Sequence, residues 1–154
     1  MKGKCVYAGS FDPPTNGHLD IIGKCNMMFD EVVVAIGVNE SKKYTYPLEK
    51  RLEMLKAACA RYECVTVVSF DGLLADFIRT VGTNYYVRGI RDGKDVEYEE
   101  RCFDINVSKN EDIETIFLPC SKEVKNVSST LVKKLLAEGK SVEKYVPAEV
   151  LKLL

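Results

Sequence analysis

One segment near the amino terminus has the residue types that bind and activate a phosphate. Residues 9–18 read GSFDPPTNGH and join a short apolar run to a helical pattern. Free backbone N–H groups and the positive end of the helix dipole are therefore expected beside Gly17 and His18. An imidazole there, able to donate from either nitrogen, can meet charge that grows on a phosphoryl oxygen. The alternative is a surface histidine on an ordinary turn, although His18 is the only histidine of the chain.

Two further segments carry positive charge. Ser41-Lys42-Lys43 alone is typical of a solvated turn, and its position after an apolar run is what brings Lys42 forward. Residues 88–91 read RGIR, and two guanidinium groups on a glycine-containing turn can grip separate phosphates. Ion pairing with a nearby carboxylate is the competing interpretation for these arginines, the candidates being Asp92, Asp95 and Glu97.

Three hydroxyl residues in a row, Ser128, Ser129 and Thr130, open the last long helical pattern. Capping of the helix accounts for one hydroxyl but not for three. A second phosphate site at this helix start is the hypothesis that accounts for the others.

The elements that must position these groups are short apolar runs alternating with helical patterns. Five such runs are typical of buried parallel strands: residues 4–8, 32–36, 65–68, 85–87 and 113–118. Leu48, Leu52, Leu55 and Cys59 follow helical spacing, as do Leu74, Phe77, Ile78 and Val81. Pro47 at a first helical position and Gly139 after a last one suit helix ends.

This alternation predicts an α/β fold: a Rossmann-like, doubly wound, parallel five-stranded sheet with helices on both faces. Ligands of such sheets bind outside the carboxyl ends of the strands. Residues 9–18, Lys42, residues 88–91 and Ser128 all follow predicted strands. The sequence therefore predicts that its phosphate-binding residues converge at one edge of the sheet.

Composition limits the remaining possibilities. The 154 residues predict one domain, 1–154, and a formal charge of −1 gives no general basic field for nucleic acid or an anionic membrane. The six cysteines lack metal-ligand spacing and are predicted to be free thiols. No apolar run has the length of a signal peptide core or a membrane span, so we expect a cytoplasmic protein.

Taken in order, the motifs resemble those of the phosphopantetheine adenylyltransferase family, within the nucleotidyltransferase superfamily marked by T-x-G-H or H-x-G-H. T-x-G-H alone is a weak signal, but the similar segments run nearly the whole length of the chain: residues 9–13, 15–18, 41–43, 88–91, 98–99, 119–123 and 127–133. Ser10 stands where the family often has threonine, and residues 124–126 lack the aromatic side chains of some relatives.

The resemblance implies direct in-line attack of the phosphate of 4′-phosphopantetheine on the α-phosphorus of ATP, assisted by Mg²⁺ bound with ATP. The products would be dephospho-coenzyme A and pyrophosphate. It also implies a homohexamer inhibited by coenzyme A. No metal ligands are expected from the chain itself.

The resemblance also implies roles for individual residues. The catalytic residues would be His18, Lys42, Arg88 and Ser10, with His18 at the α-phosphate and Lys42 and Arg88 on the acceptor phosphate. The substrate site would add Leu74 and Asn106 along the pantetheine arm. The ATP site would comprise Ser10, Phe11, His18, Gly89, Ile90, Arg91, Glu99, Val124, Lys125, Asn126, Val127, Ser128, Ser129 and Thr130.

Three other readings of the sequence compete. Nucleotidyltransferases that act on nicotinate mononucleotide, or that use CTP with an alcohol phosphate, share the histidine motif. Class I aminoacyl-tRNA synthetases share it too, but 154 residues leave no room for tRNA-binding domains. A non-catalytic nucleotide sensor is the alternative from another class, because the same loops can bind ATP without chemistry.

Overall fold

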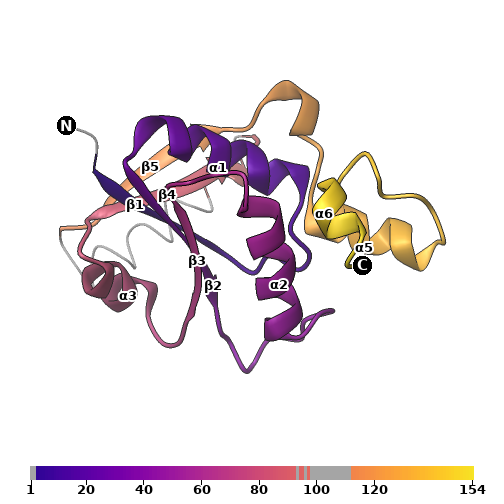
Figure 1. Ribbon diagram of the computed structural model, residues 1–154, viewed down its shortest axis with the longest axis horizontal. Helices are drawn as coiled ribbons and strands as arrows, with labels where there is room; N and C mark the ends of the chain where they lie inside the picture. The colour runs from indigo at the N-terminus through magenta and orange to yellow at the C-terminus, as the bar shows by residue number, and fades with distance from the viewer. Residues whose placement is uncertain (1–2, 93, 96, 98–111) are drawn as a thin grey trace.

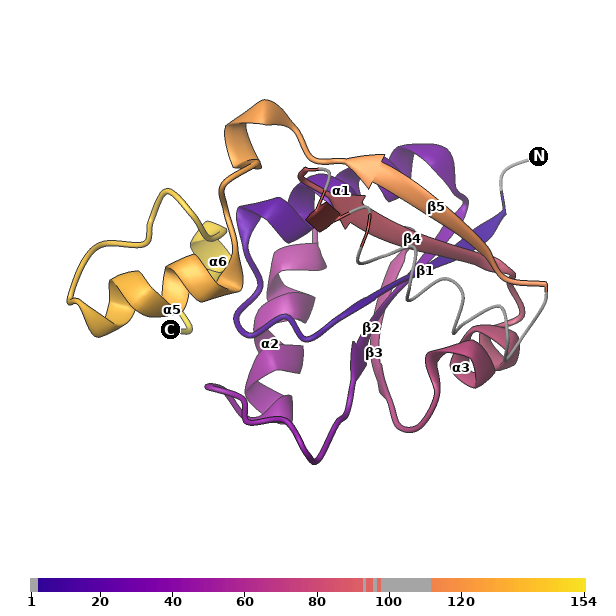
Figure 2. The same cartoon turned by 180° about the vertical axis from the view of Figure 1, so that it is seen from behind.

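The computed structural model describes residues 3–92, 94, 95, 97 and 112–154. From residue 4 to residue 90 the strands and helices alternate along the chain, as Figures 1 and 2 show from opposite sides. The elements are β1 (Lys4–Gly9), α1 (Asn16–Met28), β2 (Glu31–Gly37), α2 (Leu48–Cys59), β3 (Val65–Phe70), α3 (Leu74–Val81), β4 (Tyr85–Ile90), β5 (Glu114–Pro119), the 3-10 turn η1 (Lys122–Val124), α5 (Ser129–Ala137) and α6 (Ala148–Leu151).

The five strands of the described part form one sheet in the order β3-β2-β1-β4-β5, and each neighbouring pair is parallel. The predicted fold class and all five predicted strands are confirmed, with ends that differ by a few residues. The chain first builds outward from β1 to β3 and then continues with β4 on the other side of β1. This reversal of strand order between β1 and β4 places a crevice at their carboxyl ends, where doubly wound sheets bind ligands.

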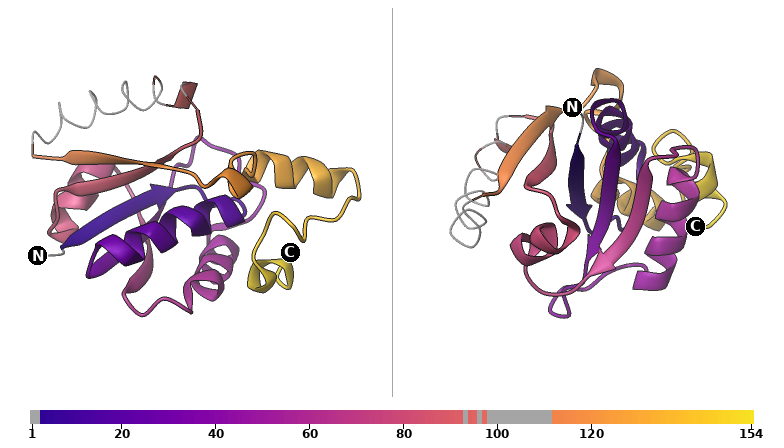
Figure 3. Two further views of the ribbon diagram at one scale, coloured as in Figure 1. Left: turned by 90° about the horizontal axis from the view of Figure 1, so that it is seen from above. Right: turned by 60° about the vertical axis from the view of Figure 1, so that its left-hand side comes forward.

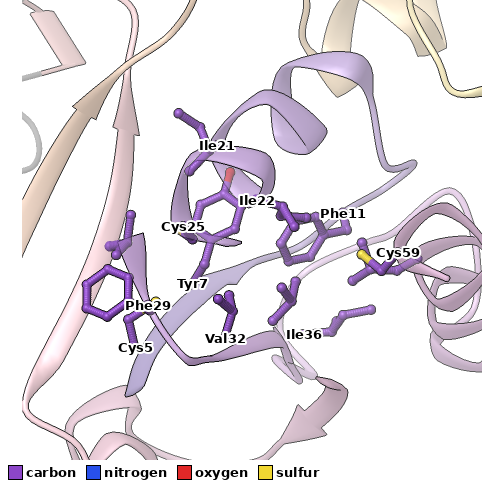
Figure 4. Close-up of a cluster of buried hydrophobic side chains, with 13 residues drawn as sticks. Cys5, Tyr7, Phe11, Ile21, Ile22, Cys25, Phe29, Val32, Ile36 and Cys59 are labelled. Carbon is purple, nitrogen blue, oxygen red and sulfur yellow. The ribbon is translucent and has the colours of Figure 1, made fainter. Parts of the chain in front are cut away.

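The two faces of the sheet are covered by different helices (Figure 3). On one face α1 and α2 pack on the strands through a cluster that includes Phe11, Ile22 and Leu55 (Figure 4). On the other face α3 contributes Ala75 and Ile78 to a smaller cluster. Helices α5 and α6 join a third cluster with α1 and α2 beyond the sheet. The core therefore fixes α1 and α5 at the carboxyl end of the strands.

The helix ends follow the sequence signals closely. Pro47 is the N-cap of α2 rather than its first helical residue, and its carbonyl accepts the N–H of Arg51 at 3.1 Å. Gly139 has a φ of 67°, and Gly82, after α3, has a φ of 77°. Glycine adopts these left-handed conformations without the Cβ clash of other residues, so both helices stop where the sequence places glycine.

Two further observations bear on earlier predictions. No helix in the described part of the chain is long and apolar enough to cross a membrane. Cys5, Cys25, Cys59, Cys64 and Cys120 are free thiols, as predicted, and Cys102 lies outside the described residues.

Candidate active site

A cleft of about 860 Å³ lies at the carboxyl ends of the strands. It is lined by residues from the loops that follow β1, β2, β3, β4 and β5. Of the residues predicted to bind or react, the cleft brings together Ser10, His18, Lys42, Leu74, Arg88, Gly89, Arg91, Val127, Ser128 and Ser129. The fold thus brings residues that are far apart in the sequence, from Ser10 to Ser129, to one cleft.

His18 is held in the first turn of α1 by the start of its own helix. Its Nδ1 atom accepts the backbone N–H of Thr15 at 3.0 Å, while the hydroxyl of Thr15 lies 3.1 Å from the same nitrogen. The backbone N–H of His18 donates in turn to that hydroxyl, which completes a capping box. Because a backbone N–H can only donate, Nδ1 carries no proton. The expectation of a donor at either nitrogen is therefore corrected: Nε2 alone can donate.

The electrostatic surroundings keep this imidazole neutral. Burial, together with the positive charges of Arg91 and Arg88, lowers the pKa of His18 to about 4. The ring of Phe11 packs edge-on against the imidazole, with 4.8 Å between ring centroids. At neutral pH His18 is thus an oriented, uncharged hydrogen-bond donor.

Phe11 itself is placed in the core and not in the cleft lining. Its side chain is buried between Tyr7 and His18, at the turn where its own φ is 46°. The same ring lies close to Gly9, where a Cβ would be 3.3 Å from the Phe11 side chain, a tight contact. Phe11 is therefore placed to orient His18, and its predicted contact with ATP stays a prediction.

Lys42 and Arg88 reach the cleft from different elements. Lys42 lies in the exposed segment between β2 and α2, where its N–H donates to the carbonyl of Asn39 at 3.1 Å. Arg88 lies in β4, and its Nη1 donates to the carbonyl of Ala8 in the neighbouring strand β1 at 3.2 Å. The two cations therefore face one space from opposite sides of β1.

Arg91 shows the ion pairing that competed with phosphate binding. Its Nε lies 3.1 Å from Oδ2 of Asp95, and its Nη2 lies 3.4 Å from Oδ1. Partial burial opposes the charge of Asp95, but the hydrogen bonds from Arg91 outweigh it and keep the pKa of this carboxyl below its ordinary value. The guanidinium of Arg91 thus forms a structural ion pair with Asp95. Because Arg91 also lines the cleft beside Gly89, it remains a candidate for binding ATP.

The three hydroxyl residues at the start of α5 have different surroundings. Ser128 is the N-cap, and its Oγ accepts the N–H of Leu131 at 3.1 Å. Ser129 Oγ donates to the carbonyl of Pro13 at 2.8 Å, which joins α5 to the loop after β1. Thr130 is exposed and lies outside the cleft lining. Two of the three hydroxyls thus have structural partners, and the second phosphate site at this helix start stays a prediction.

The segment before α5 contributes less to the cleft than predicted. Val127 lines it, whereas Val124, Lys125 and Asn126 do not, and neither does Ile90 at the end of β4. Glu99 and Asn106 lie outside the described residues. The structure thus gathers ten of the predicted positions at the cleft, and the roles of all the predicted residues stay predictions.

Gly17 has a packing reason as well as the predicted one. A Cβ at this position would lie 3.2 Å from the carbonyl oxygen of Val127, which is a tight contact with rigid backbone. The start of α1 therefore lies directly against the segment that leads into α5. This contact brings two helix N-termini to one cleft.

Sequence reasoning missed several residues that build the site. Thr15, the cap of α1, had a signal in its position three residues before His18. Arg51 also had one, because it lies on the apolar stripe of α2 between Leu48 and Leu55 and is 2% exposed. Asp12, 4% exposed, had no signal beyond its place in the loop after β1.

The described residues contain no group of three or more histidine, cysteine, aspartate or glutamate side chains that could hold a metal ion.

The sequence of this chain is similar to those of known proteins. Residues 6–135 match the model of the cytidylyltransferase-like family. A protein of Campylobacter concisus, described as a phosphopantetheine adenylyltransferase, is 40% identical over 154 residues, covering 100% of this chain and 99% of its own. A protein of Actinobacillus pleuropneumoniae with the same description is 41% identical over 151 residues, 98% and 96% of the two chains.

The chain belongs to the phosphopantetheine adenylyltransferase family. The resemblance seen in the sequence motifs is thereby confirmed. The fold is shared more widely than the family. A crystal structure from Vibrio parahaemolyticus, assigned as a nicotinate-nucleotide adenylyltransferase, has a TM-score of 0.74 and 21% identity, covering 100% of this chain and 92% of that one. At this identity the likeness concerns the fold alone.

Proposed function

We propose that this protein transfers AMP from ATP to 4′-phosphopantetheine, giving dephospho-coenzyme A and pyrophosphate, a reversible step in the synthesis of coenzyme A. The observation that carries the proposal is the convergence of His18, Lys42, Arg88 and the start of α5 on one cleft, in a chain that matches phosphopantetheine adenylyltransferases over their full length. A cation in β4, a cation in the segment after β2 and two helix N-termini suit a reaction between two phosphate-bearing substrates.

In this reaction His18 stabilises the transition state as a neutral donor. Thr15 holds Nδ1, so Nε2–H is the atom that meets the α-phosphate oxygen on which charge grows. Because the ring is oriented before substrate arrives, no reorganisation is needed when the charge develops. The proton stays on Nε2, and His18 acts as neither base nor nucleophile.

Lys42 and Arg88 hold the acceptor phosphate, and Ser10 orients the reacting groups between them. A phosphate dianion favours more than one cation, and these two approach from opposite sides of β1. Held in this way, the acceptor oxygen attacks the α-phosphorus in line and the pyrophosphate leaves on the opposite side. Positioning of two bound substrates then supplies much of the rate enhancement.

The nucleotide lies on the α5 side of the cleft in this proposal. Its phosphates face the start of α5 at Ser128 and Ser129 and the Gly17 turn of α1, where helix dipoles favour anions. Gly89 and Arg91 complete this side. The pantetheine arm extends toward Leu74, and Leu73 and Phe70 line the same part of the cleft with apolar surface.

Mg²⁺ would enter this site as part of the ATP complex, with the nucleotide phosphates among its ligands. This ion commonly keeps several waters and is held through substrate phosphates with few protein ligands. When bound, Mg²⁺ would neutralise charge on the departing pyrophosphate.

Three further features of the proposal rest on the family. They are a homohexameric assembly, feedback inhibition by coenzyme A and a cytoplasmic location. The free thiols of the described cysteines agree with a reducing compartment.

Pyrophosphate release, coupled to a colour reaction, tests the function directly. The purified protein is given ATP and Mg²⁺ with 4′-phosphopantetheine, nicotinate mononucleotide or glycerol 3-phosphate, and the last also with CTP. We expect turnover with 4′-phosphopantetheine alone. Turnover with either other acceptor would transfer the chain to another nucleotidyltransferase activity, and ATP binding without any turnover would favour a sensor.

A further inference from the structure

Two buried charges lie beside the cleft without being part of its lining. Asp12 is in the loop after β1 and Arg51 is in α2, and they are 4% and 2% exposed. A buried charge is costly unless its hydrogen bonds are satisfied. Their partners therefore indicate what these side chains hold in place.

Asp12 binds the segment that carries Lys42. Its Oδ2 accepts the backbone N–H of Thr45 and its Oδ1 accepts that of Tyr46, both at 2.9 Å. On its other side the Nζ of Lys133, in α5, lies 3.4 Å from Oδ2. One carboxylate thus joins the Lys42 segment to the helix whose start faces the cleft.

Arg51 binds the same segment from α2. Its Nε donates to the carbonyl of Tyr46 at 3.0 Å, and its Nη1 donates to the carbonyl of Ser10 at 2.8 Å. The guanidinium also lies over the ring of Tyr44, 3.9 Å from the centroid. The planar fork of arginine makes these contacts at once, which a lysine ammonium does not reproduce.

The segment held in this way has few other anchors. Residues 38–47 connect β2 to α2, and most of them are exposed. In the described structure, the backbone of this segment is tied to other elements near its two ends. Val38 donates to the carbonyl of Phe70, and Thr45 and Tyr46 bond to the two buried charges. Lys42 lies between these anchors.

We propose that Asp12 and Arg51 are positioning residues that set Lys42 against the Ser10 loop and the start of α5, so that the acceptor phosphate is held in line with ATP. This inference rests on the proposed function, because it gives these residues an effect on the acceptor. Neither residue touches substrate. Both act through the segment of residues 44–46. We call this segment, together with Asp12 and Arg51, the Asp12–Arg51 brace.

The decisive variant is Arg51→Lys, which keeps the buried charge but loses the fork. We expect kcat/KM for 4′-phosphopantetheine to fall about 10- to 100-fold, the scale of misplacing a substrate-binding group, while KM for ATP changes less than about threefold. Lys50→Met is the matched control: Lys50 is the neighbouring cation of α2 and pairs with Glu53 on the surface, so its loss should leave both parameters unchanged.

A double-mutant cycle separates positioning of Lys42 from a general loss of structure. In a Lys42→Ala background, Arg51→Lys should cost less than about threefold, because residues that act through one another are not additive. An equal loss in both backgrounds would overturn the proposal and make Arg51 a purely structural residue.

Amide hydrogen exchange tests the brace without any substrate. In Asp12→Asn, one of the two backbone donors loses its carboxylate oxygen and faces an amide NH₂ instead. Exchange at Thr45 and Tyr46 should therefore be faster than in the parent protein, and the amides of β1 should be unaffected. If the parent releases no pyrophosphate with 4′-phosphopantetheine, the proposed function fails, and the exchange rates still decide whether the brace holds. Unchanged exchange at both residues would refute the brace itself.

Discussion

The two sides of the cleft hold the groups proposed to bind phosphate in different ways. His18 lies in the first turn of a helix, and its Nδ1 has two contacts with Thr15, at 3.0 and 3.1 Å. Lys42 lies in an exposed segment, and the backbone hydrogen bonds described between this segment and other elements are made near its two ends, at Val38 and at Thr45 and Tyr46. A donor that meets a transition state must be in place before charge develops, whereas a cation that captures a substrate must reach solvent. The difference in anchoring matches this difference in task.

The largest expected effect comes from removing the rigid donor. His18→Ala should lower kcat by about two to three orders of magnitude, as for loss of one preorganised transition-state donor, with a much smaller change in ATP affinity. Turnover measured beside calorimetric ATP binding checks this. Near-normal turnover in a folded variant would remove His18 from the mechanism and with it the proposed contrast between the two sides.

The protonation state of His18 gives the second test. Because this is the chain's only histidine, its imidazole NMR signals need no assignment by mutation. The midpoint should lie near pH 4, with the proton on Nε2 throughout the neutral range. A midpoint near the ordinary value of 6.5 would show that burial and the two arginines do not keep the ring neutral.

The same pKa makes a prediction for stability. Since the pKa of His18 is lower in the folded protein than in the unfolded chain, the unfolded chain binds the extra proton first as the pH falls. His18 therefore contributes stability that is fully present above pH 6.5 and is lost as the pH falls toward 4. Urea unfolding of the parent and of His18→Ala between these pH values should give a steeper decline for the parent, and parallel declines would contradict the assignment.

The cations of the acceptor side should show a smaller and different effect. Lys42→Ala and Arg88→Ala should each raise KM for 4′-phosphopantetheine about tenfold or more, as for loss of one charge-assisted contact, and raise KM for ATP less. Steady-state kinetics with each substrate varied in turn measures both. The opposite pattern would assign the two cations to the nucleotide and leave the Asp12–Arg51 brace without its proposed purpose.

The sequence predicted the strands and the meeting of the site residues better than it predicted the hydrogen bonds that hold the Lys42 segment. The strands were predictable because buried apolar runs are local patterns, and the convergence of His18, Lys42 and Arg88 then followed from the rule for parallel sheets. Three of the four hydrogen bonds that Asp12 and Arg51 make in the brace were not predictable, because they join residues 33 to 41 positions apart in the sequence. Only Arg51 left a trace, as a charge on an apolar stripe.

Two side chains of the predicted ATP site have structural partners that the motif did not indicate. Phe11 is buried between Tyr7 and His18, where an aromatic ring gains from burial, and its contact with ATP stays a prediction. The hydroxyl of Ser129 donates to the carbonyl of Pro13, and its contact with ATP also stays a prediction. Motif membership shows that a residue is near the site, and not which way its side chain turns.

The smallest expected effect concerns the helix caps, and it tests what fixes the imidazole. Thr15→Ala removes the capping hydroxyl of α1 and should cost about 1 kcal/mol of stability, as should Ser128→Ala at the start of α5. Catalysis should respond less, because the backbone N–H of residue 15 still donates to Nδ1 of His18 after the substitution. We therefore expect kcat of Thr15→Ala to fall less than about tenfold, well short of the loss of a transition-state donor.

Thr15→Ser keeps the hydroxyl and serves as the control for the lost methyl group. Urea unfolding and kcat measured on all three variants check both statements. A loss of kcat in Thr15→Ala as large as in His18→Ala would mean that the Thr15 hydroxyl, and not the backbone N–H, orients the imidazole. The position of His18 would then depend on a single side chain, as the position of Lys42 depends on the Asp12–Arg51 brace.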